Sequence, residues 1–109
     1  MPKGYFLGDF EMLVLAALVR LGDDAYAVTI KHDIERRAKR PASLGAIHAG
    51  IGRLSDKGFV ALRMSDPLPV QGGRARKYAR ITAAGRRALR ESTSAVARMI
   101  EGLELGTRS

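Results

Sequence analysis

Apolar residues recur at intervals of three and four in three successive segments of the first half of the chain, and this period predicts three helices. The helices should cover residues 10–21, 25–40 and 43–58, with a very short turn between the second and the third. Ser43 is placed to cap the start of the third helix, and Gly58 follows it as a C-terminal glycine. The pattern therefore predicts a trio of helices joined by short connections.

The apolar stripe of each helix predicts which side chains face the core. These are Phe10, Leu13, Val14, Ala17, Leu18 and Leu21 in the first helix, Tyr26, Ile30 and Ile34 in the second, and Leu44, Ile47, Ile51 and Leu54 in the third. Asp9 is expected to cap the first helix, Gly22 to end it, and the second helix should end before Pro41.

After residue 58 the period changes from helical to alternating, as expected for two strands over 59–64 and 76–82. Between them, residues 65–73 contain two prolines and two glycines, which suits an exposed hairpin tip. One strand places Val60, Leu62 and Met64 on one face, and the other opposes Lys77, Ala79 and Ile81 to Arg76, Tyr78 and Arg80. A two-stranded hairpin should thus follow the three helices.

A last helix is predicted over residues 83–105, with Thr82 as its cap. Leu89, Val96 and Leu103 recur in it every seven residues, flanked by Met99 and Ile100. That stripe has no obvious partner inside so small a domain.

Length and composition limit the possible functions. The chain has 109 residues, enough for one compact unit, and its 19 Lys and Arg against 11 Asp and Glu give a net charge of +8. Such a charge favours a polyanionic partner, either nucleic acid or an anionic membrane surface. The most hydrophobic window, residues 12–21, is too short to span a bilayer, and the absence of cysteine excludes disulfides and thiolate chemistry. We expect a soluble cytoplasmic protein.

Three helices followed by a hairpin predict a winged helix-turn-helix, mainly helical with a small β-hairpin, in which the third helix enters the DNA major groove. Residues 72–90 contain no acidic residue and seven basic ones. Arg74, Arg76 and Lys77 on the hairpin suit a surface that meets phosphates, although taken alone they would describe a solvated edge strand. On this interpretation residues 1–81 form the DNA-binding domain, and residues 82–109 follow it as a last helix and tail.

The segments LGDFEMLVLAALVRLGDDAYAVTI, SLGAIHAGIGRLSDKGFV and GGRARKYARITAAGRRAL, in this order and spacing between Leu7 and Leu89, resemble the PadR family of bacterial transcriptional regulators. The resemblance implies a winged-helix homodimer that binds operator DNA, usually as a repressor, with C-terminal helices that help form the dimer. On this resemblance residues 82–109 are the dimerisation helix and tail, and the predicted dimer interface consists of Leu89, Val96, Ile100 and Leu103. The single short helix at the C-terminus resembles the smaller subfamily. Two positions depart from the family pattern: His48 stands where many members have tyrosine, and Ala79 where a second aromatic is common in the wing.

If the apolar stripe of the third helix faces the core, the remaining positions face DNA. The candidate DNA-binding residues are Ser43, Gly45, Ala46, His48, Ala49 and Arg53 on the helix and Arg74, Arg76 and Lys77 on the hairpin. We interpret His48 as a candidate for base contact or as a histidine without a special role. Arg53 lies late in the helix, so a phosphate contact is favoured over a base contact. Gly45, Gly50 and Gly52 indicate close approach to DNA or to another helix.

Other kinds of site find little support. GAIHAGIG has the glycine spacing of a phosphate-binding loop, but Ile51 and Gly52 stand where lysine and a hydroxyl residue are required. We interpret His32, Asp33 and Glu35 as a surface cluster rather than a metal site, because neighbouring residues point to different sides of a helix. Nothing resembles an activated nucleophile, and no cofactor is expected. Tyr26 and Tyr78 are expected to pack with exposed tips rather than to bind phosphate.

The sequence therefore predicts a sequence-specific transcriptional regulator that is not an enzyme, a homodimeric repressor of a near-palindromic operator on double-stranded DNA. An alternative is a winged-helix adaptor that docks an acidic protein partner. A small-molecule effector is also open, and since the chain has no tryptophan its pocket would rely on Phe10, Met12 or Met99.

Overall fold

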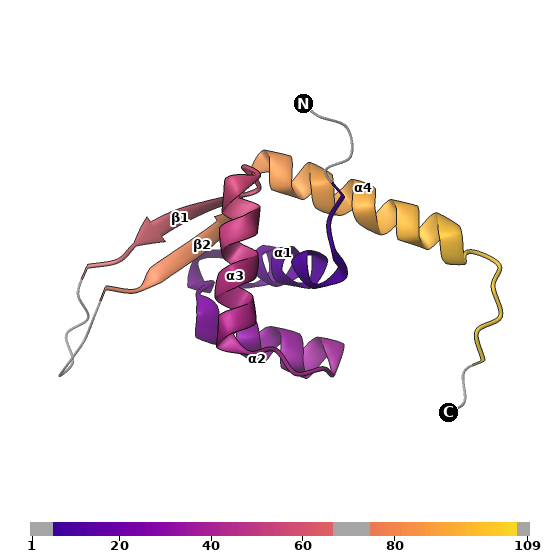
Figure 1. The fold of residues 1–109 in the computed structure, drawn as a ribbon, viewed down its shortest axis with the longest axis horizontal. Helices are drawn as coiled ribbons and strands as arrows, with labels where there is room; N and C mark the ends of the chain where they lie inside the picture. Colours follow the sequence, from indigo (N-terminus) through magenta and orange to yellow (C-terminus); the bar gives the residue numbers. More distant parts are fainter. Residues whose placement is uncertain (1–5, 67–74, 107–109) are drawn as a thin grey trace.

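The computed structural model describes residues 6–66 and 75–106 (Figure 1). In chain order the elements are α1 (Asp9–Leu21), the 3₁₀ turn η1 (Gly22–Asp24), α2 (Ala27–Ala38), α3 (Leu44–Asp56), β1 (Val60–Met64), β2 (Lys77–Ile81) and α4 (Ala83–Ile100). The predicted order of three helices, a hairpin and a last helix is confirmed, and the fold is a mainly helical winged helix-turn-helix. In Figure 1 the hairpin and the far end of α4 project from the helices in opposite directions.

The core lies around α1, which packs against α2, α3, α4 and β2. Val14, Leu15 and Leu18 of α1 are buried there with Ile47 and Leu54 of α3. Among residues 6–66 and 75–106, no helix is both long and apolar enough to cross a bilayer. Contact with α1 therefore positions α2, α3, α4 and β2 relative to one another.

The caps of α1 and α3 follow the local sequence, with one correction. Ser43 caps α3 as predicted, since its Oγ accepts a hydrogen bond from the Ala46 amide at 3.0 Å. The cap of α1 is Gly8, so the prediction of Asp9 was wrong by one residue. The reason is Glu11, whose Oε1 accepts the Gly8 amide at 2.8 Å and so fixes the helix start one residue earlier.

The prediction that Leu44 faces the core is also wrong, because 42% of this residue is exposed. Leu44 is the first residue of α3 and lies at the end of its apolar stripe. Ala42, in the preceding segment, is buried at that end of the helix instead. The core face of α3 therefore begins at Ile47, and Leu44 joins the exposed surface.

The two strands pair antiparallel, with Val60 opposite Ile81 and Arg63 opposite Tyr78. The chain just before α2 also joins the hairpin, because the Ala79 amide donates to the Ala25 carbonyl at 2.9 Å. This bond ties the outer edge of β2 to the helix-turn-helix. The predicted tip of the hairpin lies largely outside the described residues, which end at Asp66 and resume at Ala75.

Helix α4 starts against the hairpin and ends earlier than predicted. Thr82 caps it as expected, with its Oγ1 accepting the Gly85 amide at 3.0 Å. The helix ends at Ile100 rather than continuing to residue 105, because Glu101 adopts an extended backbone with ψ 129° and Gly102 follows with a positive φ of 81°. Leu103 thus lies beyond the helix and does not continue its heptad stripe.

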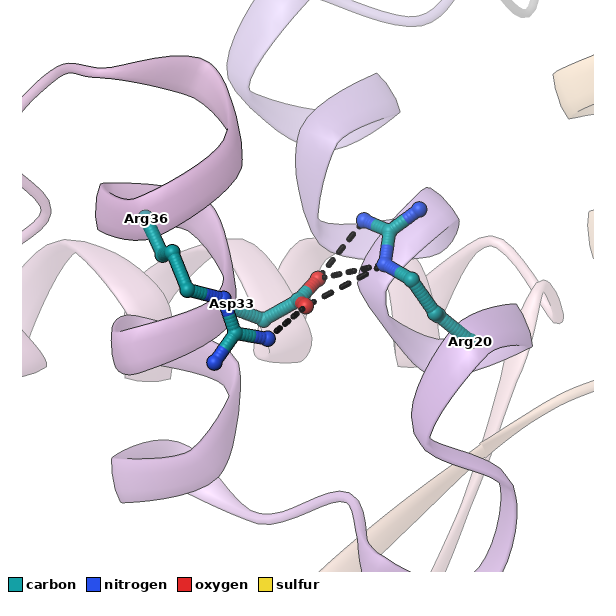
Figure 2. Close-up of polar contacts among 3 residues, drawn as sticks. All are labelled: Arg20, Asp33 and Arg36. Atoms are coloured by element: carbon teal, nitrogen blue, oxygen red, sulfur yellow. Dashed lines mark hydrogen bonds and ion pairs between the residues drawn. The ribbon is translucent and has the colours of Figure 1, made fainter.

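One carboxylate is buried between α1 and α2 (Figure 2). Asp33, 2% exposed, accepts hydrogen bonds from Arg20 Nε at 3.0 and 3.1 Å and from Arg20 Nη2 at 2.6 Å, and Arg36 approaches it at 3.4 Å. The Arg20 hydrogen bonds hold the pKa of Asp33 below its usual value, although burial opposes this. The prediction that His32, Asp33 and Glu35 form a surface cluster is therefore wrong for Asp33, which joins two helices. In the described part of the chain no group of side chains is arranged to hold a metal ion.

Candidate nucleic-acid interface

Helix α3 buries one face and exposes the opposite one. Ile47, Gly50, Ile51 and Leu54 are buried. All six predicted DNA-facing positions of the helix are exposed: Ser43, Gly45, Ala46, His48, Ala49 and Arg53. Gly52 belongs to the same surface, with Gly45 and Ala49 along its centre and His48 to one side. The exposed face is thus almost free of long side chains along its middle.

The three glycines of α3 lie in two different surroundings. A Cβ at Gly50 would meet the Phe10 ring at 3.7 Å, an ordinary contact distance, so this glycine faces α1. At Gly45 and Gly52 a Cβ would meet no atom within 4 Å. Packing within the protein therefore requires glycine at none of the three positions, although glycine costs a helix about 1 kcal/mol in its interior.

Arg53 extends from the edge of this face towards α1. Its Nε lies 3.4 Å from Glu11 Oε2, and Lys57 Nζ lies 3.1 Å from the same oxygen. Burial acts most strongly on the pKa of Glu11 and raises it, but the hydrogen bonds from Gly8, Lys57 and Arg53 together outweigh burial and leave the pKa below its usual value. Glu11 is therefore charged at neutral pH. Arg53 is still 53% exposed and can turn part of its guanidinium outward.

The hairpin carries cations on both strands. Lys77 is exposed and Arg76 half-buried, while Arg74 lies outside the described residues. The Arg76 amide donates to Ser65 Oγ at 2.8 Å, and the Ser65 amide donates to the Arg76 carbonyl at the same distance. These bonds extend the pairing beyond the strands and fix the backbone from which Arg76 projects.

The charges of the hairpin differ from those of α1 to α3 in their partners. Ion pairs join Arg20 and Arg36 to Asp33, Lys31 to Glu35, Arg40 to Asp9, and Arg53 and Lys57 to Glu11. Within residues 6–66 and 75–106, no ion pair involves the hairpin cations Arg63, Arg76, Lys77 and Arg80, nor Arg86, Arg87 and Arg90 of α4. Much of the positive charge of the helices is thus neutralised internally, whereas that of the hairpin remains available to an anionic partner.

A match to a known family accompanies this geometry. Residues 14–91 match the sequence profile described as the Transcriptional regulator PadR-like family. The chain belongs to this family. No curated protein matches the chain.

Solved structures of PadR-like proteins share the fold. A PadR family transcription regulator from hypervirulent Clostridium difficile R20291 is 23% identical, with a TM-score of 0.69, covering 86% of this chain and 92% of that one. One from Eggerthella lenta DSM 2243 is 25% identical, with a TM-score of 0.66, covering 86% and 83%. Bacillus subtilis PadR, solved in complex with operator DNA, is 17% identical, with a TM-score of 0.65, covering 92% of this chain and 53% of that chain.

The structure of this PadR-like chain also brings together residues that the sequence analysis did not combine. Tyr26 and Tyr78 meet edge to face, with ring centroids 5.5 Å apart, so their packing is as predicted. Arg76 lies over the Tyr26 ring and Arg63 over the Tyr78 ring. Arg63 was not a predicted site residue. Its position could have been inferred only from the strand register, which the sequence pattern did not fix.

Proposed function

We propose that this PadR-like chain is a homodimeric, sequence-specific DNA-binding repressor, with α3 in the major groove and the hairpin against the adjoining phosphates. The observation that carries the proposal is the contrast between two neighbouring surfaces. The exposed face of α3 has room for the edges of base pairs, and the hairpin cations beside it form no ion pair within residues 6–66 and 75–106. The operator complex of Bacillus subtilis PadR supports the same assignment by similarity of fold.

The first test is duplex binding as a function of salt. Genome-wide mapping of bound DNA should recover one near-palindromic site, with half-sites about 10 base pairs apart, centre to centre, or a multiple of this. Affinity for that site should fall at least tenfold when salt rises from about 50 to 200 mM, because several phosphate contacts release counterions. A protein that recovers no preferred sequence but forms a stoichiometric complex with an acidic protein would instead be the adaptor. Expression of the neighbouring gene should rise when the regulator is deleted, and a fall would contradict repression.

The glycines of α3 give a sharper prediction. Gly52→Ala should raise the free energy of unfolding by up to about 1 kcal/mol, because alanine favours the helix and the added methyl meets nothing. The same change, and Gly45→Ala, should weaken operator binding by about tenfold if DNA approaches the backbone there, a cost near 1.4 kcal/mol. The measurements are urea unfolding and fluorescence anisotropy with a labelled operator.

Ser94→Ala is the matched control, since Ser94 is an exposed position of α4, away from α3. It should raise helix stability by a few tenths of a kcal/mol and leave DNA affinity unchanged. Operator affinity that is unchanged in Gly45→Ala and Gly52→Ala would show that this face of α3 does not meet DNA closely.

The dimer is proposed from α4 and the groove beside it. Val96, Met99 and Ile100 are exposed on the half of α4 that projects away from the helices (Figure 1). Between α1 and the first half of α4 lies an open groove of about 560 Å³, with Met12 and Leu89 among its lining. In the proposed dimer, the exposed apolar side chains on the projecting half of a partner's α4 pack against the apolar side chains that line this groove. A small-molecule effector stays a prediction, and of the three residues predicted for its pocket only Met12 lines this groove.

Ile100→Glu should convert the dimer to a monomer at micromolar concentration. An unpaired carboxylate in an apolar interface costs about 3 kcal/mol or more, which weakens association at least a hundredfold. Sedimentation velocity measures the outcome. Ser94→Glu adds the same charge to the opposite side of α4 and should remain dimeric. Equal assembly of the two variants would place the interface elsewhere.

A further inference from the structure

Four side chains lie together where the hairpin meets the start of α2: Arg76, Tyr26, Tyr78 and Arg63. We call this group the wing-base cluster. The Arg76 Cζ lies 4.0 Å from the centroid of the Tyr26 ring, and the Arg63 Cζ lies 4.5 Å from that of Tyr78. The two rings meet at 73°. Arg76 Nη1 also lies 3.5 Å from the Tyr78 hydroxyl, a long hydrogen bond. Each guanidinium therefore rests on an aromatic ring, and the rings rest on each other.

The backbone of each member is fixed by a bond of its own. Arg63 is paired opposite Tyr78, so both side chains lie on one face of the hairpin. The Tyr26 amide donates to Thr29 Oγ1 at 3.0 Å at the start of α2, and the neighbouring Ala25 carbonyl accepts the Ala79 amide. The cluster thus joins both strands of the hairpin to the first turn of α2, which is the helix that precedes α3.

An arginine whose guanidinium lies over an aromatic ring can still donate most of its hydrogen bonds to another group. A guanidinium donates in its own plane, so a ring on its face restricts its direction while most of its N–H groups remain available to an anion. Neither Arg63 nor Arg76 forms an ion pair with a carboxylate in the described part of the chain, whereas Arg20 and Arg53 do. The hydrogen bond to Tyr78 is the main cause that raises the pKa of Arg76, and Asp24 adds a smaller rise without pairing with it. An arginine held in direction and not neutralised is suited to bidentate binding of a phosphate.

We propose that Arg63 and Arg76 bind phosphate groups of the DNA backbone, and that Tyr26 and Tyr78 are positioning residues that aim them. The proposal rests on the proposed DNA-binding function and adds to it Arg63 as a contact residue and the tyrosine pair as its support. Because Tyr26 belongs to the start of α2, the cluster fixes the spacing between the phosphates held by the hairpin and the groove occupied by α3.

The experiment measures the slope of log affinity against log salt concentration on the mapped operator and on a random duplex. Arg63→Gln and Arg76→Gln should each lower the slope by about one and weaken both duplexes severalfold, since a phosphate contact is lost. Arg98→Gln, on the far end of α4 (Figure 1), removes the same charge and should leave the slope unchanged.

The tyrosines are tested by changes that alter no charge. Tyr26→Leu should lower the salt slope by up to one, because Arg76 loses the ring that directs it, and Tyr26→Phe should keep the wild-type slope. Adding Arg76→Gln to Tyr26→Leu should then lower the slope less than it does in the wild type. A merely structural tyrosine would reduce stability without changing the slope, so thermal unfolding of each variant is measured alongside.

Three failures are distinguishable. If the wild-type protein binds no duplex in a salt-dependent way, the proposed function is wrong and this assignment fails with it. If the wild type binds with a steep slope that Arg63→Gln and Arg76→Gln leave unchanged, the proposed function stands and the wing-base contacts are wrong. A slope that falls in the arginine variants but not in Tyr26→Leu would overturn the positioning role alone.

Discussion

Replacement of Arg20 by methionine should lower the free energy of unfolding by about 3 kcal/mol at neutral pH, because it strands a buried carboxylate. Asp33 is 2% exposed, and Arg20 supplies its three shortest hydrogen bonds. Methionine keeps much of the length of the arginine stem, so the loss reports the guanidinium rather than its packing. Urea unfolding at one fixed protein concentration measures the change.

Arg36→Met is the matched control for this change. Arg36 reaches the same carboxylate at 3.4 Å with a side chain that is 72% exposed, so its loss should cost less than about 1 kcal/mol. In an Asp33→Asn background, Arg20→Met should cost much less than in the wild type, because no buried charge is left unpaired. Equal costs for Arg20→Met and Arg36→Met would mean that the Arg20–Asp33 contact in Figure 2 stabilises the fold no more than the exposed Arg36–Asp33 contact beside it.

The same pair sets a pH dependence. The hydrogen bonds from Arg20 lower the pKa of Asp33 in the folded protein from 3.8, so its contribution to stability is present above pH 3.8 and is lost as the pH falls through the lower folded value. Without Arg20, burial raises that pKa, and the variant has less stability to lose in acid. The stability gap between the wild type and Arg20→Met should therefore be full at neutral pH and narrow below pH 3.8. Asp9, Glu11 and Glu35 also have lowered pKa values, but they are present in both proteins and do not affect the difference.

The features that could be predicted from sequence are those encoded by neighbouring residues. Ser43 and Thr82 were identified as caps because a hydroxyl cap bonds to an amide three residues away, and both bonds are present. Helical and alternating periods located the four α-helices and both strands of the described residues, because these periods too are carried by residues close in sequence. The exposed face of α3 followed from its period once the buried stripe was known.

The features that were missed depend on contacts between residues far apart in sequence. Asp33 was placed on the surface because its own helix gives no sign of Arg20, which lies thirteen positions earlier on another helix. The wing-base cluster required the register that sets Arg63 opposite Tyr78, and the bond that brings Ala25 beside β2. Leu44 was assigned to the core by its spacing, although the buried face of α3 begins only at Ile47. Local patterns therefore located the exposed face of α3 and Arg76, but not Arg63 or the tyrosine rings that lie beside the two arginines.

Gly85 provides the second large effect, and its sign is opposite to that expected from helix propensity. Gly85 is buried in the first turn of α4, where a Cβ would collide with the carbonyl oxygen of Phe59 and lie 2.9 Å from Ile81 Cγ1. That carbonyl cannot move freely, since it accepts the Thr82 amide at 3.0 Å while Thr82 Oγ1 donates to the Gly58 carbonyl at 2.8 Å. An added methyl must therefore separate α4 from the end of α3 and the start of β1.

Gly85→Ala should lower the free energy of unfolding by about 3 kcal/mol, the upper part of the range for overpacking a close contact. Gly52→Ala is the same substitution in a helix with open space around it, and it should raise stability instead. Urea unfolding of the two variants side by side separates backbone contact from propensity. Stabilisation by both would show that α4 can move away from Phe59 at no cost, and that its first turn does not fix its position against the hairpin. Because α4 also carries the proposed dimer surface, a displaced first turn in Gly85→Ala should weaken dimerisation as well, which Gly52→Ala should not.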